Sequence, residues 1–186
     1  MSNNNKNTIR PLYQLTELSP REAMDKYPGP DLPVRGGWGY DQEDACIIDK
    51  NDPIIDPESP MPFYGVGYEK IFVERRIYME LITYRKEGDR YSGIEWKMLG
   101  QNLAHIEGKP HDVLKYPFTG FKDADWKSLK EEWEGPDGIN NPDFDKVKHF
   151  ERRNHLKQSF GMEFWFEISS FHGQFFSEII KNSERF

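Results

Sequence analysis

The stretch KIFVERRIYMELITYR, residues 70–85, decides how much of the chain is assigned to sheet. Its apolar side chains stand at alternate positions, namely Ile71, Val73, Ile77, Met79 and Leu81. Charged residues stand between them, at Glu74, Arg76 and Glu80. Strict alternation is typical of a half-buried strand. A helical spacing also fits, through Ile71, Arg75, Tyr78, Met79 and Ile82, so the stretch alone does not distinguish strand from helix.

The residues C-terminal to this stretch favour the strand. KEGDR (86–90) is typical of a turn, and RYSGIEWKML (90–99) alternates again, so two alternating runs flank a glycine-containing loop. This pattern predicts a long antiparallel hairpin. A second loop, IEGKP (106–110), leads into DVLKYPFTGF (112–121), which is expected to be a third strand of a meander. Pro117 places that strand at an edge or a bulge, since proline lacks the N–H that a central strand uses.

Helices are expected at both ends of this region. Ser19, Pro20 and Glu22 have the N-cap, N1 and N3 pattern of a short helix. KDADWKSLKEEWEG (122–135) predicts the clearest helix, and residues 144–158 and 172–180 are further helical segments. The segments 45–48 and 162–169 read as strands.

The fold class predicted from these elements is α+β: an antiparallel sheet, formed as a meander of long strands, with one or two helices packed on one face. Residues 1–10 are polar and are expected to form a disordered tail, followed by a single domain over residues 11–186. Aromatic residues make up 15% of the chain, so the core is expected to consist mainly of rings.

The cysteine content and the N-terminus bear on location. Cys46 is the only cysteine, so no internal disulfide can form, and a reducing compartment is expected. It stands beside Ile47 and Ile48, which predicts an inert, buried thiol. The first ten residues contain no apolar segment, and no apolar run approaches the length of a membrane span. We therefore expect a cytoplasmic protein that does not associate with membranes.

The net charge of −7 is concentrated in two blocks. Residues 31–60 contain eight acidic and two basic residues, and so do residues 123–145. One interpretation is solvated loops and a solvated helix face. The other is a single acidic surface, which would attract a basic protein and repel nucleic acid. Direct nucleic-acid binding is disfavoured, since it needs clustered lysine and arginine.

The segment RGGWGYDQEDACIID (35–49) places two aromatic residues among glycines and acids. It lacks the Gly-Lys-Ser/Thr of a phosphate loop, and the neighbouring acidic segments do not match a calcium loop, so no cofactor or metal is predicted. Its rings are either tucked into the core or, if exposed, form a protein-binding hot spot beside carboxylates. On the second interpretation the predicted partner-binding residues are Trp38, Tyr40, Asp41, Glu43, Asp44, Asp49 and Asp52.

A histidine-containing segment supplies the alternative function. On a helix, His149 and His155 would lie about 120° apart and share no ligand. On a strand they would share a face with Glu151 and Arg153, in a constellation suited to a metal-dependent or acid–base hydrolase or nuclease. The alternative interpretation is that these are ordinary surface histidines in a solvent-exposed basic segment.

The leading interpretation is a non-enzymatic cytoplasmic module that binds a basic protein. It includes no catalytic residue. The size, charge and lack of catalytic motifs are similar to those of bacterial immunity and antitoxin proteins that neutralise nuclease toxins, so a toxin is one such partner. Self-association into a homodimer that buries the aromatic residues is a third interpretation.

Overall fold

The computed structural model describes residues 9–173 of the chain, which form an α+β fold with a mixed sheet. The elements, in chain order, are a 3-10 helix Leu12–Gln14, α1 Pro20–Asp25, β1 Val34–Gly36, β2 Cys46–Ile48, α2 Gly65–Tyr78 with a π-helical turn Met79–Thr83, β3 Tyr91–Trp96, β4 Gly100–Ile106, β5 Lys109–Lys122, α3 Asp123–Glu134, α4 Lys146–Leu156 and β6 Gln158–Glu167. None of the helices in this range is long and apolar enough to cross a membrane.

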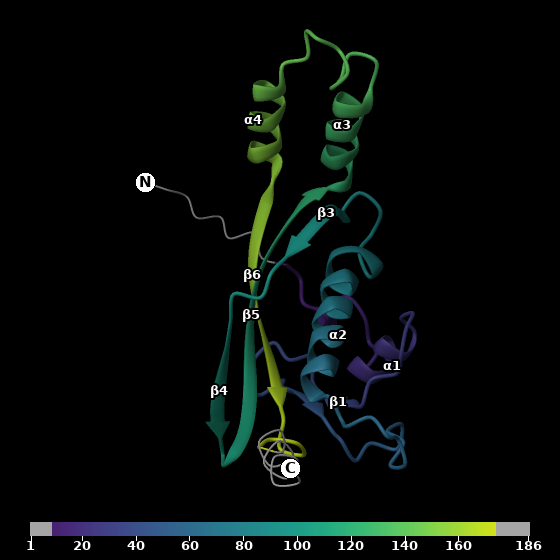
Figure 1. The fold of residues 1–186 in the computed structure, drawn as a ribbon, viewed down its shortest axis with the longest axis vertical. Coiled ribbons are helices and arrows are strands. Elements are labelled where there is room, and N and C mark those ends of the chain that lie inside the picture. Colours follow the sequence, from purple (N-terminus) through teal and green to yellow (C-terminus); the bar gives the residue numbers. More distant parts are fainter. Residues whose placement is uncertain (1–8, 174–186) are drawn as a thin grey trace, which may run out of the picture.

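The sheet is built around the long strand β5 (Figure 1). Its order is β1-β2-β6-β5-β3, and β4 also pairs with β5. Along one edge of β5, β4 pairs with residues 109–115 and β3 with residues 118–122. All pairs are antiparallel except β2 with β6, which is parallel. The α+β class is thus confirmed and the sheet is mostly antiparallel, but it is mixed and not purely a meander.

The strand predicted over residues 70–85 is wrong, because this stretch belongs to α2 and the π-helical turn. Its buried positions recur at helical spacing, at Glu69, Phe72, Val73, Arg76, Ile77 and Glu80. Three of these are charged and fully buried. The alternating pattern assigned Arg76 and Glu80 to the solvent side, and that assignment was the source of the error.

Helix α2 lies against one face of the sheet (Figure 1). Phe72 meets Phe166 of β6 edge to face, with ring centroids 5.4 Å apart. The predicted helix at residues 123–134 is present as α3, but it begins at the end of β5 instead of covering the sheet. The helix that packs on the sheet is therefore the segment that had been assigned to strand.

Pro117 lies within β5, which has neighbours on both sides, so its predicted edge position is wrong. The backbone carbonyls of Lys115 and Pro117 accept hydrogen bonds from Leu99 and Lys97. Both point toward the edge shared by β3 and β4, and the missing N–H of Pro117 points the same way. Since β4 pairing stops at Lys115 and β3 pairing starts at Phe118, the proline occupies a gap where no ladder bond is lost.

Several local predictions are confirmed. Ser19 and Glu22 form the expected capping box of α1. The predicted strand at residues 45–48 is present as β2, and the aromatic run near residue 164 is part of β6. Cys46 is buried as expected. The predicted terminal helix lies almost entirely outside the described residues, as do residues 1–8 of the predicted tail.

Candidate functional site

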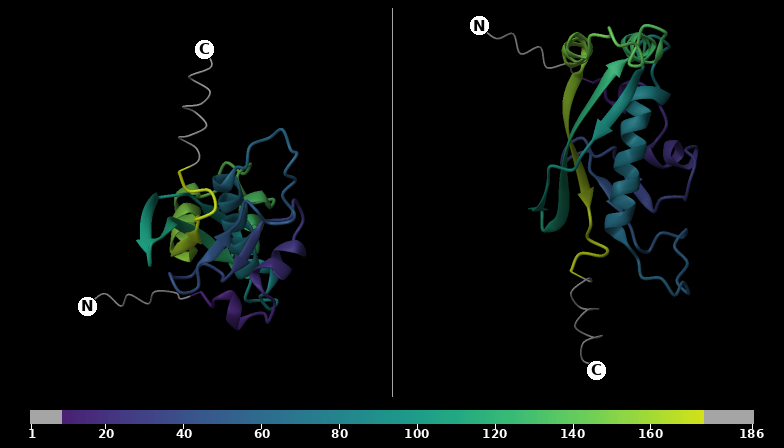
Figure 2. Two further views of the ribbon diagram at one scale, coloured as in Figure 1. Left: turned by 90° about the horizontal axis from the view of Figure 1, so that it is seen from below. Right: turned by 45° about the horizontal axis from the view of Figure 1, so that its top comes forward.

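A pair of helices projects from one end of the sheet (Figures 1 and 2). Helix α3 begins directly after β5, and α4 leads into β6 through Lys157, so two paired strands continue into two neighbouring helices. In the right-hand view of Figure 2 the two helices are seen side by side. We call residues 123–156, which comprise both helices and their connecting loop, the helical arm.

The inner face of the helical arm contains an aromatic cleft of about 260 Å³. Helix α3 contributes the predicted stripe of Trp126, Leu129 and Trp133, and α4 contributes His149 and Phe150. The ring centroid of Trp133 lies 5.0 Å from that of His149 and 5.7 Å from that of Phe150. These aromatic contacts join α3 to α4 and leave the space between them open.

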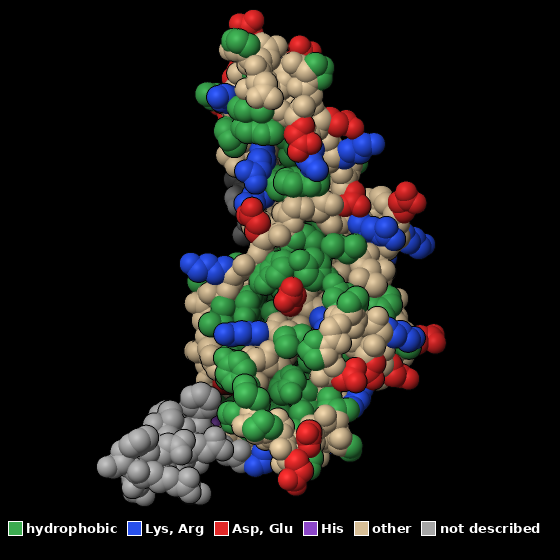
Figure 3. Space-filling view, turned by 45° about the vertical axis from the view of Figure 1, so that its right-hand side comes forward, with side chains coloured by type: hydrophobic (Ala, Val, Ile, Leu, Met, Phe, Trp, Pro, Cys, Tyr) green, Lys and Arg blue, Asp and Glu red, His purple; other side chains and the backbone are tan. Residues whose placement is uncertain are grey.

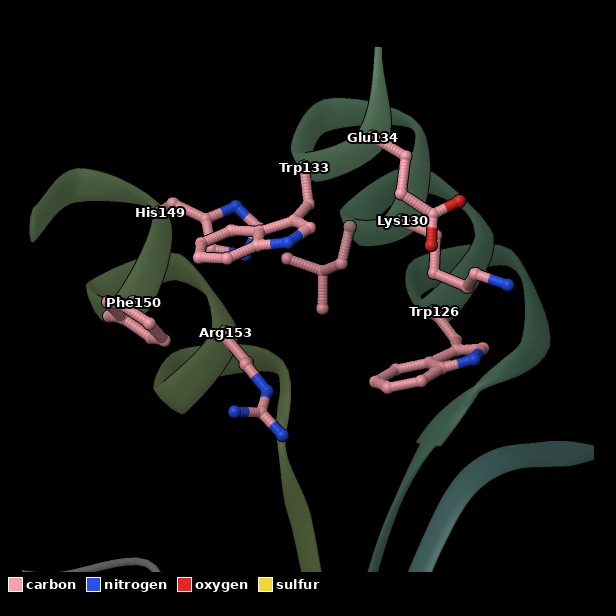
Figure 4. A pocket seen from close by; sticks show the side chains of 8 residues that line it. Trp126, Lys130, Trp133, Glu134, His149, Phe150 and Arg153 are labelled. Carbon is pink, nitrogen blue, oxygen red and sulfur yellow. The ribbon is translucent and has the colours of Figure 1, made fainter. Parts of the chain in front are cut away.

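Charged side chains border the aromatic cleft, at Lys130, Glu134 and Arg153. Figure 4 shows Arg153 and Trp126 reaching toward the cleft from opposite helices. Trp126 is held in place by Phe121, with ring centroids 5.1 Å apart. Arg153 lies 3.8 Å from the Glu95 carboxylate. The cleft therefore has fixed walls, and the charge of its arginine is partly compensated.

His149 is a positioning residue of the helical arm. Only 4% of it is exposed, and its Nδ1 lies 3.2 Å from Oε1 of Glu132 on α3. The other oxygen of Glu132 contacts Nη1 of Arg152, so this carboxylate joins α3 to two residues of α4. The imidazole is packed among the rings of Trp133, Phe144 and Phe150, and it lines one side of the aromatic cleft.

The structure does not form the predicted hydrolase constellation. Residues 146–156 are helical, so His149 points inward while Glu151 and His155 are exposed. The strand geometry that would bring the three together is wrong. Within residues 9–173, no group of three or more His, Cys, Asp or Glu side chains is arranged to hold a metal ion.

The rings of the predicted partner-binding segment are turned inward. Trp38 is only 5% exposed, and Tyr40 is half-buried. Nη1 of Arg76 donates to the backbone carbonyls of Trp38 and Gly39, at 2.7 and 3.0 Å. The N–H of Trp165 on β6 donates to the carbonyl of Gly39 at 3.0 Å. These bonds hold the glycine-rich segment against α2 and β6, so Trp38 is not the exposed ring that the second interpretation requires.

Four of the five predicted partner-binding acids have partners within the protein. Asp44 accepts hydrogen bonds from the backbone N–H groups of Trp38 and Tyr40. Asp49 pairs with Arg35, and the buried Asp52 pairs with Arg21. Asp41 accepts hydrogen bonds of 2.9 Å from the backbone N–H groups of Glu43 and Asp44, and both Asp41 and Glu43 are exposed. Most of this acidic segment therefore stabilises its own loop.

The two acidic blocks do not converge on one surface. The block at residues 123–145 belongs to the helical arm, which meets β6 near Gln158. The block at residues 31–60 contains β2, which pairs with Phe166. Eight residue steps along a strand correspond to about 27 Å. Figure 1 shows the two regions at opposite ends of the sheet, so the expectation of a single acidic surface is wrong.

The tip of the helical arm combines exposed acids with exposed apolar groups. Glu134, Asp137 and Asp143 are exposed and form no ion pair within residues 9–173. Val147 and Phe150 are 69% and 44% exposed. Figure 3 shows acidic side chains at the end of the molecule, next to hydrophobic ones. The sequence contained both signals, but the tryptophan stripe had been interpreted as a helix face that packs on the sheet.

A pair of carboxyl groups is buried between α2 and β5. Glu69 is fully buried, and Asp112 is nearly so and accepts a hydrogen bond of 2.8 Å from Gln101. Burial, together with the charge of Asp112, raises the pKa of Glu69 to about 8. Burial also raises the pKa of Asp112. Glu69 is thus held in its protonated form at neutral pH.

Comparison with family models, with curated proteins and with solved structures gives no significant match to this chain. Its function is therefore inferred from the surfaces described above. The segment at residues 38–52 is largely occupied by internal bonds, whereas the helical arm presents open rings and unpaired acids.

Proposed function

We propose that this protein is a non-enzymatic binding module that binds a basic partner protein with the tip of its helical arm. The observation that carries the proposal is the open aromatic cleft of a projecting helix pair, beside acids that form no ion pair within residues 9–173. The proposed surface is still acidic and aromatic, but we assign it to residues 123–156 instead of residues 38–52.

The rings supply the apolar part of the interaction. Trp and other aromatic side chains dominate binding energies when a partner covers them, since they lose a large apolar area to the interface at little cost in entropy. Phe150 and Val147 stand on α4 beside the cleft and are substantially exposed. A partner that buries them gains roughly 1.5–3 kcal/mol for each side chain that becomes fully covered.

The charges favour a basic partner. The cations nearer the sheet are compensated, since Arg152 pairs with Glu132, and Arg153 and Lys157 pair with Glu95. Within residues 9–173, the tip acids Glu134, Asp137 and Asp143 form no ion pair. Residues 134–148 contain four acids against two lysines, Lys146 and Lys148, so the tip carries an excess of negative charge. Such an excess attracts an oppositely charged surface and accelerates its approach. A basic toxin fits these requirements, as does any other protein with a basic, apolar patch.

Affinity purification from the native cell tests this proposal. The bait is the full chain, compared with a Val147→Ser/Phe150→Ser variant and with Leu99→Ser, an exposed control outside the helical arm. A basic protein should co-purify with the wild type and the control and be lost with the double variant. Its release should rise steeply with salt. Equal recovery with all three baits, or recovery only of a second copy of this chain, would contradict the proposal.

A further inference from the structure

A second cleft lies between the N-terminal segment and the first half of β6. Its volume is about 760 Å³, within the range of small-molecule sites. Its walls include Tyr13 and Phe160, and its floor is formed by Tyr40, Arg76 and Glu80. We call it the N-terminal cleft. It combines apolar walls with a few buried polar groups, as ligand sites commonly do.

The floor is a preformed network centred on Arg76. This arginine is fully buried, and its guanidinium carbon lies 3.7 Å from the ring centroid of Tyr40 and 4.4 Å from that of Phe164. Nε donates to Oε1 of Glu80 at 2.8 Å, and Nη1 is used by backbone carbonyls. The charge of Arg76 is thus matched within the protein, and these donors are already in use.

One carboxylate oxygen of Glu80 accepts no hydrogen bond from the described residues. Its Oε1 accepts from both Arg76 and the Tyr40 hydroxyl. Its Oε2 is buried and has no hydrogen-bond partner within residues 9–173. A buried acceptor without a donor is destabilising, so a ligand that supplies one gains this interaction. Glu80 also stands in the π-helical turn Met79–Thr83, an irregularity that is frequent at functional sites.

We propose that the N-terminal cleft binds a small organic ammonium ion with an apolar body. Its N–H group would donate to Oε2 of Glu80, since hydrogen bonds to a charged acceptor are strongest when the donor is also charged. Tyr13 and Phe160 line the cleft, and aromatic rings attract a cation and pack against its apolar part. Glu163 adds a second carboxylate at the cleft, held only by an exposed pair with Lys115.

Isothermal titration with three probes of one shape tests the ligand class. The probes are 2-phenylethylammonium, 2-phenylethanol and phenylacetate, at pH 7 with the full chain. The ammonium ion should bind to saturation and at least about tenfold more tightly than the other two. Equal affinities, a preference for the carboxylate, or no saturable binding would overturn the proposal.

Two variants test the location. Glu80→Gln should weaken binding of the ammonium ion by about tenfold. Because Glu80 also balances Arg76, a second variant leaves this charge pair intact: Tyr13 lines the cleft and is 59% exposed, so Tyr13→Ala removes one ring of the cleft while Arg76 and Glu80 stay paired. Tyr13→Ala should weaken binding of the ammonium ion by about fivefold at an unchanged unfolding temperature. Tyr64→Ala, at a 52% exposed position outside the cleft, is the matched control. Full affinity in Tyr13→Ala would place the binding elsewhere and overturn the assignment.

Discussion

The guanidinium carbon of Arg76 lies 3.7 Å from the ring centroid of Tyr40, although the two residues belong to α2 and to the loop between β1 and β2. This stacking, with the bonds from Arg76 to the carbonyls of Trp38 and Gly39, fixes the glycine-rich loop against the helix. Trp38, in the loop that the sequence suggests as a binding surface, is therefore part of the core.

Removing Arg76 should destabilise the protein strongly. Arg76→Leu leaves Glu80 as a buried charge without its cation, and we expect a loss of about 3–5 kcal/mol in the free energy of unfolding. The double variant Arg76→Leu/Glu80→Leu should recover a large part of this loss, because it removes both charges. Urea denaturation of the wild type and both variants measures the difference. Equal instability of the single and double variants would show that charge balance is not the cause.

The buried pair Glu69 and Asp112 should make stability depend on pH. The pKa of Glu69 is raised from 4.5 to about 8 in the folded protein, so the folded state retains a proton that the unfolded state releases. The free energy of unfolding is therefore highest below pH 4.5. It falls as the pH rises from 4.5 toward 8, by up to about 5 kcal/mol. Glu69→Gln should flatten this part of the stability curve, and the exposed Glu163→Gln should not. A wild-type curve without a fall between pH 5 and 8 would contradict the buried, protonated state.

The helical arm should open independently of the sheet. Its small core contains Leu129, which is 3% exposed, so Leu129→Ala should cost about 2–4 kcal/mol locally. Amide hydrogen exchange should then accelerate in α3 and α4 and stay unchanged in β6. Val147→Ala, at a 69% exposed position of α4, is the control. Acceleration that extends through β6 would show that the arm and the sheet unfold as one unit.

Cys46 should be unreactive in the native protein. Its side chain is fully buried in β2, and burial raises the pKa of its thiol well above the ordinary value. At pH 8, a disulfide reagent such as 5,5′-dithiobis(2-nitrobenzoate) should therefore label it only after denaturation. Rapid stoichiometric labelling of the folded protein would contradict this position.

The sequence predicted those elements whose signals are local. The capping box of Ser19 and Glu22 and the spacing of Trp126, Leu129 and Trp133 depend only on nearby residues, and both helices are present. Helix α2 was assigned to strand because Arg76 and Glu80 were counted as solvent-facing. Their burial depends on contacts with residues about 40 positions away, which no local pattern reveals.

The candidate site was predicted in kind but not in place. The acidic block at residues 123–145 and the tryptophan stripe were both recognised, yet only the structure shows that they meet on a projecting arm. The segment with Trp38 and Asp44 also combines aromatic and acidic residues, but Trp38 is buried and Asp44 accepts hydrogen bonds from its own loop. The two segments differ in how far their side chains are exposed to solvent. That exposure depends on the tertiary structure and cannot be deduced from composition.

The association rate with the purified partner tests the central claim most directly. The comparison is between the wild type, a Glu134→Lys/Asp137→Lys/Asp143→Lys variant of the arm tip, and the control Asp41→Lys/Glu43→Lys, at low and at physiological salt. The arm-tip variant should associate at least about tenfold more slowly at low salt, and the control should retain a rate close to that of the wild type. An unchanged rate in the arm-tip variant, or a larger loss in the control, would contradict binding by the helical arm.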